Sequence, residues 1–133
     1  MGIFKLNKNS VGYKGEKIAE KFLKKKSYKI LERNWCNKKG KRIGEIDIIA
    51  QDRKTNYLVF VEVKTRKIKK DEIDVLPEEQ ITHAKLNKLN RIAEVYTKEN
   101  ELGDAMWRID ALSVLIIEGE KTPKIKHIES IFY

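Results

Sequence analysis

Two acidic residues on neighbouring apolar segments are the first feature of the sequence that points to chemistry. Asp47 lies within Glu45–Ala50 and Glu62 lies within Tyr57–Lys64, and both segments are rich in β-branched residues. A polar turn over 53–56 divides them, which predicts a β-hairpin. If the turn is centred on the middle of this stretch, Asp47 lies directly opposite Glu62. Residues opposed across a ladder have Cβ atoms about 5 Å apart, so the two carboxylates are expected to share one small volume.

Opposed carboxylates need compensation, and a divalent cation supplies it. Like charges directly opposite each other destabilise a sheet, and partly buried carboxylates lose hydration. Mg²⁺ takes one or two carboxylates and completes its shell with water and phosphate oxygens. Such an ion polarises a phosphate and helps to form an attacking hydroxide. Lys64 shares a strand face with Glu62, so its ammonium is expected to orient the water or offset negative charge.

The simpler alternative is an ordinary charged surface, on which Lys64 pairs with Glu45 or Glu62 and Asp47 is solvated. The apolar neighbours argue against it, because strands this apolar are expected to be central. The register is an assumption, and a shift by one residue would separate the two faces.

Glu16 is a third acid, and it borders the apolar stripe of a helix predicted over 11–26. A helix packed on the hairpin would aim this side chain at the same carboxylates. The alternative is that Glu16 lies in the first helical turn and interacts only with the helix dipole.

The remaining elements predict an α/β fold with a mixed central sheet flanked by helices. Their order is helix, three-stranded meander, helix and two strands. Beyond the first helix and the hairpin, the expected elements are a strand over 28–35, a loop over 65–76, a helix from Pro77 to about 98, and strands over 107–117 and 125–132. Residues 1–10 are expected to be a flexible tail, and 11–133 a single domain.

The composition favours a polyanionic partner. Lys and Arg number 29 against 20 Asp and Glu, which gives a net charge of +9. A small domain this basic is attracted to nucleic acid, although Lys-rich surfaces also promote solubility. The single cysteine, Cys36, and the lack of an apolar run of membrane length predict a cytoplasmic protein without membrane association. His83 and His127 have no zinc-like spacing.

Basic residues that would contact backbone phosphates occur in two loops and on the second helix. They are Lys41, Arg42, Arg66, Lys67, Lys69, Lys70 and Lys85. For Lys85 the alternative is a lysine at a helix edge that extends to solvent. The acidic loop 71–74 lies near the expected substrate path, and its role is left open.

Four blocks in order resemble the YraN family of small, uncharacterised bacterial proteins. They are Gly15-Glu16, 28–34, Gly44–Ala50 and Val59–Arg66. That family is similar to the Holliday junction resolvases and the wider PD-(D/E)xK nucleases, which implies a restriction-endonuclease-like three-layer fold. Ile46 departs from the proline that names the superfamily.

The resemblance also implies roles for individual residues. Asp47 and Glu62 would bind Mg²⁺ or Mn²⁺, Lys64 would be catalytic, and Glu16 would be an accessory acid. Glu45 matches the family block without an assigned role.

A later block, Trp107-Arg108-Ile109-Asp110, resembles a family strand that often reads Arg-Phe-Asp. It implies a structural Asp110 that pairs with a buried cation.

The leading prediction is a metal-dependent endonuclease that hydrolyses phosphodiester bonds in DNA, with branched or damaged structures as candidate substrates. The alternative is a non-cleaving nucleic-acid-binding protein that retains a nuclease-like fold. A third possibility is a subunit that cuts only within a partner complex. The analogy with resolvases suggests a homodimer, and the sequence leaves DNA against RNA undecided.

Overall fold

The computed structural model describes residues 10–75 and 81–131, so positions 1–9 of the expected tail lie outside the description. Helix α1 (Val11–Lys25) has the predicted extent within one residue. Ser10 caps it, because its hydroxyl accepts a hydrogen bond of 3.0 Å from the backbone N–H of Tyr13. Ser10 therefore belongs to the helix start and not to a tail. After the helix, Ser27 adopts a left-handed φ of 72° and turns the chain into the sheet.

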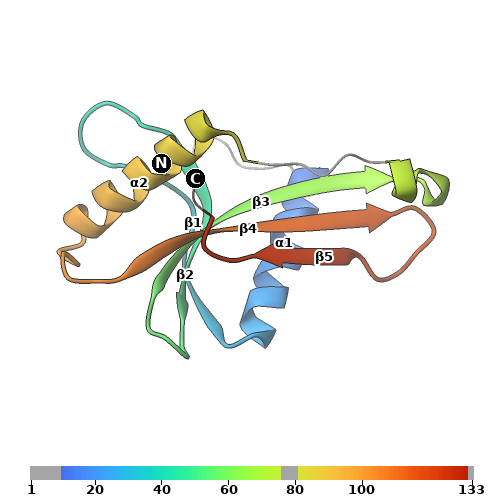
Figure 1. The fold of residues 1–133 in the computed structure, drawn as a ribbon, viewed down its shortest axis with the longest axis horizontal. Helices are drawn as coiled ribbons and strands as arrows, with labels where there is room; N and C mark the ends of the chain where they lie inside the picture. Colours follow the sequence, from blue (N-terminus) through green and yellow to red (C-terminus); the bar gives the residue numbers. More distant parts are fainter. Residues whose placement is uncertain (1–9, 76–80, 132–133) are drawn as a thin grey trace.

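A five-stranded mixed sheet forms the centre of the described part of the chain (Figure 1). The strands lie in chain order, with β3 and β4 parallel and the other neighbours antiparallel. They are β1 (Tyr28–Cys36), β2 (Glu45–Asp52), β3 (Leu58–Ile68), β4 (Trp107–Ile117) and β5 (Lys124–Ile128).

Two apolar clusters cover opposite faces of this sheet. One lies against α1 and contains Leu23 and Val59, whereas the other lies against α2 (His83–Glu99) and contains Phe60 and Leu89. Adjacent strand residues point to opposite faces, so Val59 and Phe60 mark the two sides. The predicted mixed sheet between helices is confirmed, and its three layers are consistent with a nuclease-like fold.

Three element boundaries in the described residues differ from those predicted. The loop expected from Thr65 instead continues β3 to Ile68, because β4 supplies a parallel partner as far as Ile117, and the 3₁₀ helix η1 (Lys70–Val75) follows.

The second helix begins at His83 because the Thr82 hydroxyl caps it, accepting a hydrogen bond of 3.1 Å from Lys85 N. The expected start at Pro77 lies outside the described residues. The last strand ends at Ile128, before Ser130 turns the chain with a φ of 54°.

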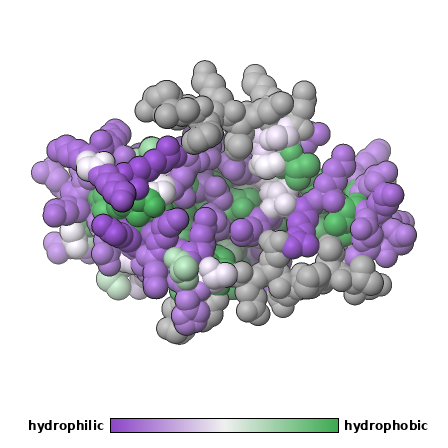
Figure 2. Space-filling model, turned by 90° about the horizontal axis from the view of Figure 1, so that it is seen from above, coloured by the Kyte–Doolittle hydropathy of each residue, from purple (hydrophilic) through white to green (hydrophobic). Residues whose placement is uncertain are grey.

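Charged side chains dominate the exterior. Figure 2 shows one face, on which hydrophilic residues surround small hydrophobic patches. No helix in the described ranges combines the length and apolar character that a membrane span requires.

Candidate metal centre at a fork between β2 and β3

The sheet divides where β2 and β3 stop pairing. Their ladder runs from the Gln51–Leu58 pair to the Ile48–Val61 pair. Beyond it, β2 stays beside β1 and β3 stays beside β4, and Figure 1 shows the two pairs of strands diverging. Asp47 and Glu62 are the next residues on β2 and β3, so they stand at the opening of this fork.

The observed register is the one predicted from the turn, since continuing the ladder by one step sets Asp47 opposite Glu62. The local backbone is irregular there. Ile46 packs in the cluster beside α2, whereas Ile48 packs in the cluster beside α1, so the usual alternation breaks at Asp47. In place of a ladder bond, the N–H of Val63 donates to Asp47 Oδ2 at 2.8 Å. The Asp47 side chain therefore bridges the two strands as they separate.

Negative charge at the fork is poorly compensated. Burial, with the neighbouring charge of Glu62 as the next cause, raises the pKa of Asp47 to about 8. Burial also raises the pKa of Glu16, and the charges of Glu45 and Glu62 act in the same direction, while a hydrogen bond from Asn34 opposes them. Glu16, Asp47 and Glu62 therefore influence one another, as expected of a shared site.

Lys85 supplies a cation from α2. Its Nζ lies 3.0 Å from Glu62 Oε2, and the Glu62 side chain is only 6% exposed. Glu45 instead pairs with Arg42 at 3.1 Å. Lys64 is exposed and forms no ion pair with any residue that the structure describes, so the alternative pairing of Lys64 with Glu45 or Glu62 is wrong.

Close packing of α1 on β3 positions Glu16. A Cβ atom at Gly15 would lie 1.7 Å from Oγ1 of Thr65, so only glycine permits this approach. Glu16 follows Gly15 and lies beyond the first helical turn, which contains no acid. The helix-dipole alternative is therefore wrong. Glu16 lines a cavity of about 150 Å³ together with Asp47 and Asn34.

Sequence reasoning missed Asn34 as a member of this site. It lies in β1 between the residues that pair with Ile46 and Ile48, and its φ of 49° is left-handed. This local kink lets its side chain reach Glu16. The only sequence signal was that asparagine tolerates the left-handed region more readily than most residues.

Comparison with known proteins identifies the family. The model of the uncharacterised protein family UPF0102 matches residues 15–114. The chain belongs to the UPF0102 family. It is 41% identical to a UPF0102 protein of Caldanaerobacter subterraneus over 96% of this chain and 98% of the relative. It is 38% identical to one of Caldicellulosiruptor saccharolyticus over 96% of this chain and 100% of that relative. UPF0102 is the YraN family, so the predicted family is confirmed. The resemblance of that family to Holliday junction resolvases stays a prediction.

The fork of this UPF0102 chain fits a hard divalent cation in its donor chemistry. No group of three or more His, Cys, Asp or Glu side chains within the described ranges is arranged to hold a metal unaided. Asp47 and Glu62 still offer two carboxylates, and Mg²⁺ commonly takes one or two and keeps several waters. Lys85 offsets Glu62 alone. Asp47 remains the group on which an added cation would have the largest electrostatic effect.

The predicted phosphate-contacting residues of the UPF0102 chain lie in three places. Lys41 and Arg42 line a cleft of about 330 Å³ with Lys88 and Arg91 of α2. Lys67, Lys69 and Lys70 are exposed at the end of β3 and the start of η1, and Arg66 is half-buried. Lys85 lies within the fork. In the acidic loop, Glu72 accepts a hydrogen bond of 2.9 Å from the N–H of Lys69.

Asp110 belongs to a separate cluster, and the predicted pairing with a buried cation is confirmed. Its Oδ1 accepts a hydrogen bond of 3.0 Å from Arg108 Nε, and its Oδ2 lies 2.8 Å from Nε2 of His127. The Asp110 side chain is fully buried. These contacts are structural, which agrees with the role that the family resemblance implies.

Proposed function

We propose that this UPF0102 protein is a metal-dependent endonuclease that hydrolyses phosphodiester bonds in DNA, with branched or damaged structures as candidate substrates. One observation carries the proposal: Asp47 and Glu62 oppose each other at the fork, where burial and mutual repulsion raise the pKa of Asp47 to about 8. A protein keeps such an unfavourable arrangement when a ligand offsets it.

Each side chain has a role in this proposal. Asp47 and Glu62 would hold Mg²⁺ or Mn²⁺. When bound, the ion would polarise the phosphodiester and acidify a water molecule. Lys64 is exposed two residues beyond Glu62, so its ammonium would orient the attacking water or offset the charge that develops on phosphate. Glu16, with its raised pKa, would hold a proton near the reacting atoms as an accessory acid.

A second candidate is a protein that binds nucleic acid without cutting it. The observation that favours it is the 3.0 Å contact between Lys85 Nζ and Glu62 Oε2, because the ammonium already occupies one side of the acidic pair. In that case the fork is a neutralised remnant, and the basic surface alone binds nucleic acid. A homodimer remains a prediction under either function.

The deciding experiment measures cleavage of junction, flap and linear DNA with Mg²⁺ or Mn²⁺. The variants are Asp47→Asn and Glu62→Gln, and the matched controls are Asp104→Asn and Glu94→Gln, which change exposed acids. The endonuclease proposal expects loss of about a hundredfold or more in rate for the two fork variants, as for removal of an electrostatic catalytic group. The controls should retain the wild-type rate.

A combined negative result for cleavage and metal binding would overturn the proposal. Wild-type protein would cut none of the substrates with either metal, and DNA binding would survive Asp47→Asn. Calorimetry would then also detect no Mn²⁺ binding. That combination would establish the non-cleaving candidate for the isolated protein.

A further inference from the structure

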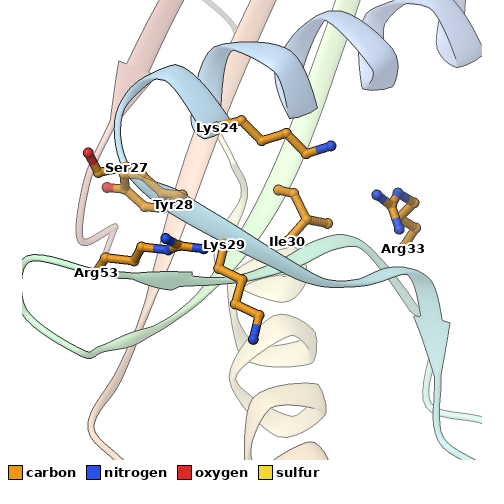
Figure 3. A pocket seen from close by; sticks show the side chains of 7 residues that line it. All are labelled: Lys24, Ser27, Tyr28, Lys29, Ile30, Arg33 and Arg53. Carbon is orange, nitrogen blue, oxygen red and sulfur yellow. The ribbon is translucent and has the colours of Figure 1, made fainter.

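A cavity with basic walls lies along the outer edge of the sheet, beside β1. Its volume is about 460 Å³, and β1 is the terminal strand of the sheet, so one of its edges is unpaired within the described residues. Figure 3 shows the seven residues that line it, of which four are cationic and none is acidic. They are Lys24, Ser27, Tyr28, Lys29, Ile30, Arg33 and Arg53.

The positive charge of this β1-edge cavity is only partly offset. Lys24 Nζ lies 3.3 Å from Glu20 Oε1, and Arg33 Nε donates to Glu20 Oε2 at 2.9 Å, so two of the cations share one carboxylate. Lys29 and Arg53 are both exposed, and neither forms an ion pair with a residue that the structure describes. Four cations thus face one acid around a concave surface. This arrangement favours an anionic ligand.

Arg33 connects this cavity to the fork. It lines the β1-edge cavity, and it also lines the smaller cavity that contains Glu16 and Asp47. The two cavities therefore share one lining side chain. A polyanion with one phosphate in the larger cavity would reach the carboxylates of the fork by extending past Arg33.

We propose that the β1-edge cavity binds a backbone phosphate of a nucleic-acid strand whose adjoining segment reaches the fork. The inference that the nucleic-acid strand runs toward the fork rests on the proposed function. The phosphate contact does not depend on whether the protein cleaves DNA. Cations around a cavity of this kind recognise phosphates without reading bases. The competing explanation is that basic residues on an edge strand only discourage aggregation. That explanation accounts for Lys29 on β1, but not for Arg53, which projects from the β2–β3 turn into the same cavity.

The test uses the full chain in EDTA, so that binding is measured without cleavage. The double variant Lys29→Gln/Arg53→Gln removes the two lining cations that have no acidic partner among the described residues. The control Lys121→Gln/Lys124→Gln removes two exposed lysines near the β4–β5 turn. Fluorescence anisotropy with a labelled oligonucleotide is recorded at several salt concentrations, and thermal unfolding verifies that both variants are folded.

The proposal expects the cavity variant to lose about tenfold in affinity at low salt. Its plot of log affinity against log salt should flatten by about 0.8, because one phosphate contact contributes roughly 0.7 to 0.9. The control should change affinity much less. Equal losses in both variants, or no loss in the cavity variant, would overturn the proposal.

Competition separates the possible sources of the anion. Inorganic phosphate at constant ionic strength should not displace the oligonucleotide at millimolar concentration, and polyglutamate should compete poorly. Displacement by phosphate would identify a small-anion site, and strong competition by polyglutamate would identify general charge attraction, and either result overturns the proposal. If this binding test succeeds but wild-type protein never cuts DNA, the proposed function fails and the phosphate site stands.

Discussion

Asp47 on β2 and Asp110 on β4 are both carboxylates of the same sheet, on the two strands that flank β3, yet the charges around them have opposite effects on their pKa. Asp110 accepts hydrogen bonds from Arg108, from His127 and from the backbone N–H of Ser130. These hydrogen bonds outweigh the effect of burial, so the pKa of Asp110 is lowered. Asp47 receives one backbone N–H and faces other acids, so its pKa is raised.

This difference separates a carboxylate that the protein itself neutralises from one that an added cation would neutralise. The Asp110 cluster brings its own counter-charge in Arg108, whose guanidinium lies 3.0 Å from Asp110 and also pairs with Asp52 at 3.4 Å and Glu129 at 3.0 Å. It needs nothing from outside the chain. The fork has Lys85 on Glu62 and no cation on Asp47 in the described part of the molecule. Burial alone therefore does not identify a functional acid. The hydrogen-bond donors and cations around the acid distinguish Asp47 from Asp110.

Removing the counter-charge of the structural cluster should cause the largest loss of stability. Arg108→Met leaves Asp110 buried without its main cation, so we expect a loss of about 3 to 5 kcal/mol in the free energy of unfolding. Urea unfolding at pH 7 measures it. Arg91→Met, which removes an exposed arginine from α2, is the matched control. A loss below about 1 kcal/mol for Arg108→Met would mean that this cluster is not the self-sufficient network described above.

Displacing α1 tests whether the fork depends on close packing. Gly15→Ala forces a methyl group against Thr65, so we expect a loss of about 1 to 3 kcal/mol from overpacking. Adding Thr65→Gly should restore part of this stability, because the obstructing Cβ is removed as well. Gly12→Ala is the control, since a Cβ there meets nothing within 4 Å. Equal stability of Gly15→Ala and Gly12→Ala would contradict the positioning argument for Glu16.

The two clusters should respond to pH in opposite directions. The pKa of Asp47 is about 8 in the folded protein against an ordinary 3.8, so the folded state keeps a proton that the unfolded chain releases. Stability from this group therefore falls as pH rises from about 4 to about 8. Asp110 has a lowered pKa, so its stabilisation is lost as pH falls through the folded value.

Asp47→Asn should accordingly raise the unfolding free energy by up to about 5 kcal/mol at pH 8, and by almost nothing at pH 4. Urea unfolding in EDTA at both pH values measures this difference, with Asp104→Asn as the control. If the gain in unfolding free energy of Asp47→Asn does not grow with pH, the ionised Asp47 carboxylate does not destabilise the folded protein.

The smallest expected signal is proton release on metal binding. A divalent cation at the fork favours the ionised form of Asp47, so Mn²⁺ binding at pH 7 should release roughly half a proton to one proton. Calorimetry in two buffers of different ionisation enthalpy counts it. Asp47→Asn should release none. Heats that are independent of the buffer for the wild type would place the metal elsewhere.

The sequence was sufficient to predict the hairpin and its register, because these depend on local features. Alternating apolar residues and a short polar turn fix which residues oppose each other, and the paired part of the ladder, which ends at Ile48 and Val61, has the expected register. The sequence was not sufficient to predict the fork itself. The separation of β2 from β3 depends on β4, whose parallel pairing with β3 involves residues distant in the chain.

Two features of the site, the ion pair of Lys85 with Glu62 and the part played by Asn34, were not predicted, for related reasons. Lys85 itself was predicted only as a contact to phosphate. Lys85 reaches Glu62 because α2 begins at His83, and that start is set by the Thr82 cap and not by the earlier proline. Asn34 acts through a left-handed kink inside a strand, which no periodicity indicates. Contacts made across elements, and single-residue departures from regular geometry, were therefore beyond the reach of the sequence pattern.

The connection between β3 and β4 has a consequence for folding. Asp47 and Glu62 meet through a short turn, whereas Lys85 arrives only after the chain has crossed over the sheet on its way to β4. Short loops close at a smaller entropic cost and sooner than long ones. During folding, the acids should therefore face each other before the lysine reaches them, so a divalent ion would meet a site with no competing ammonium.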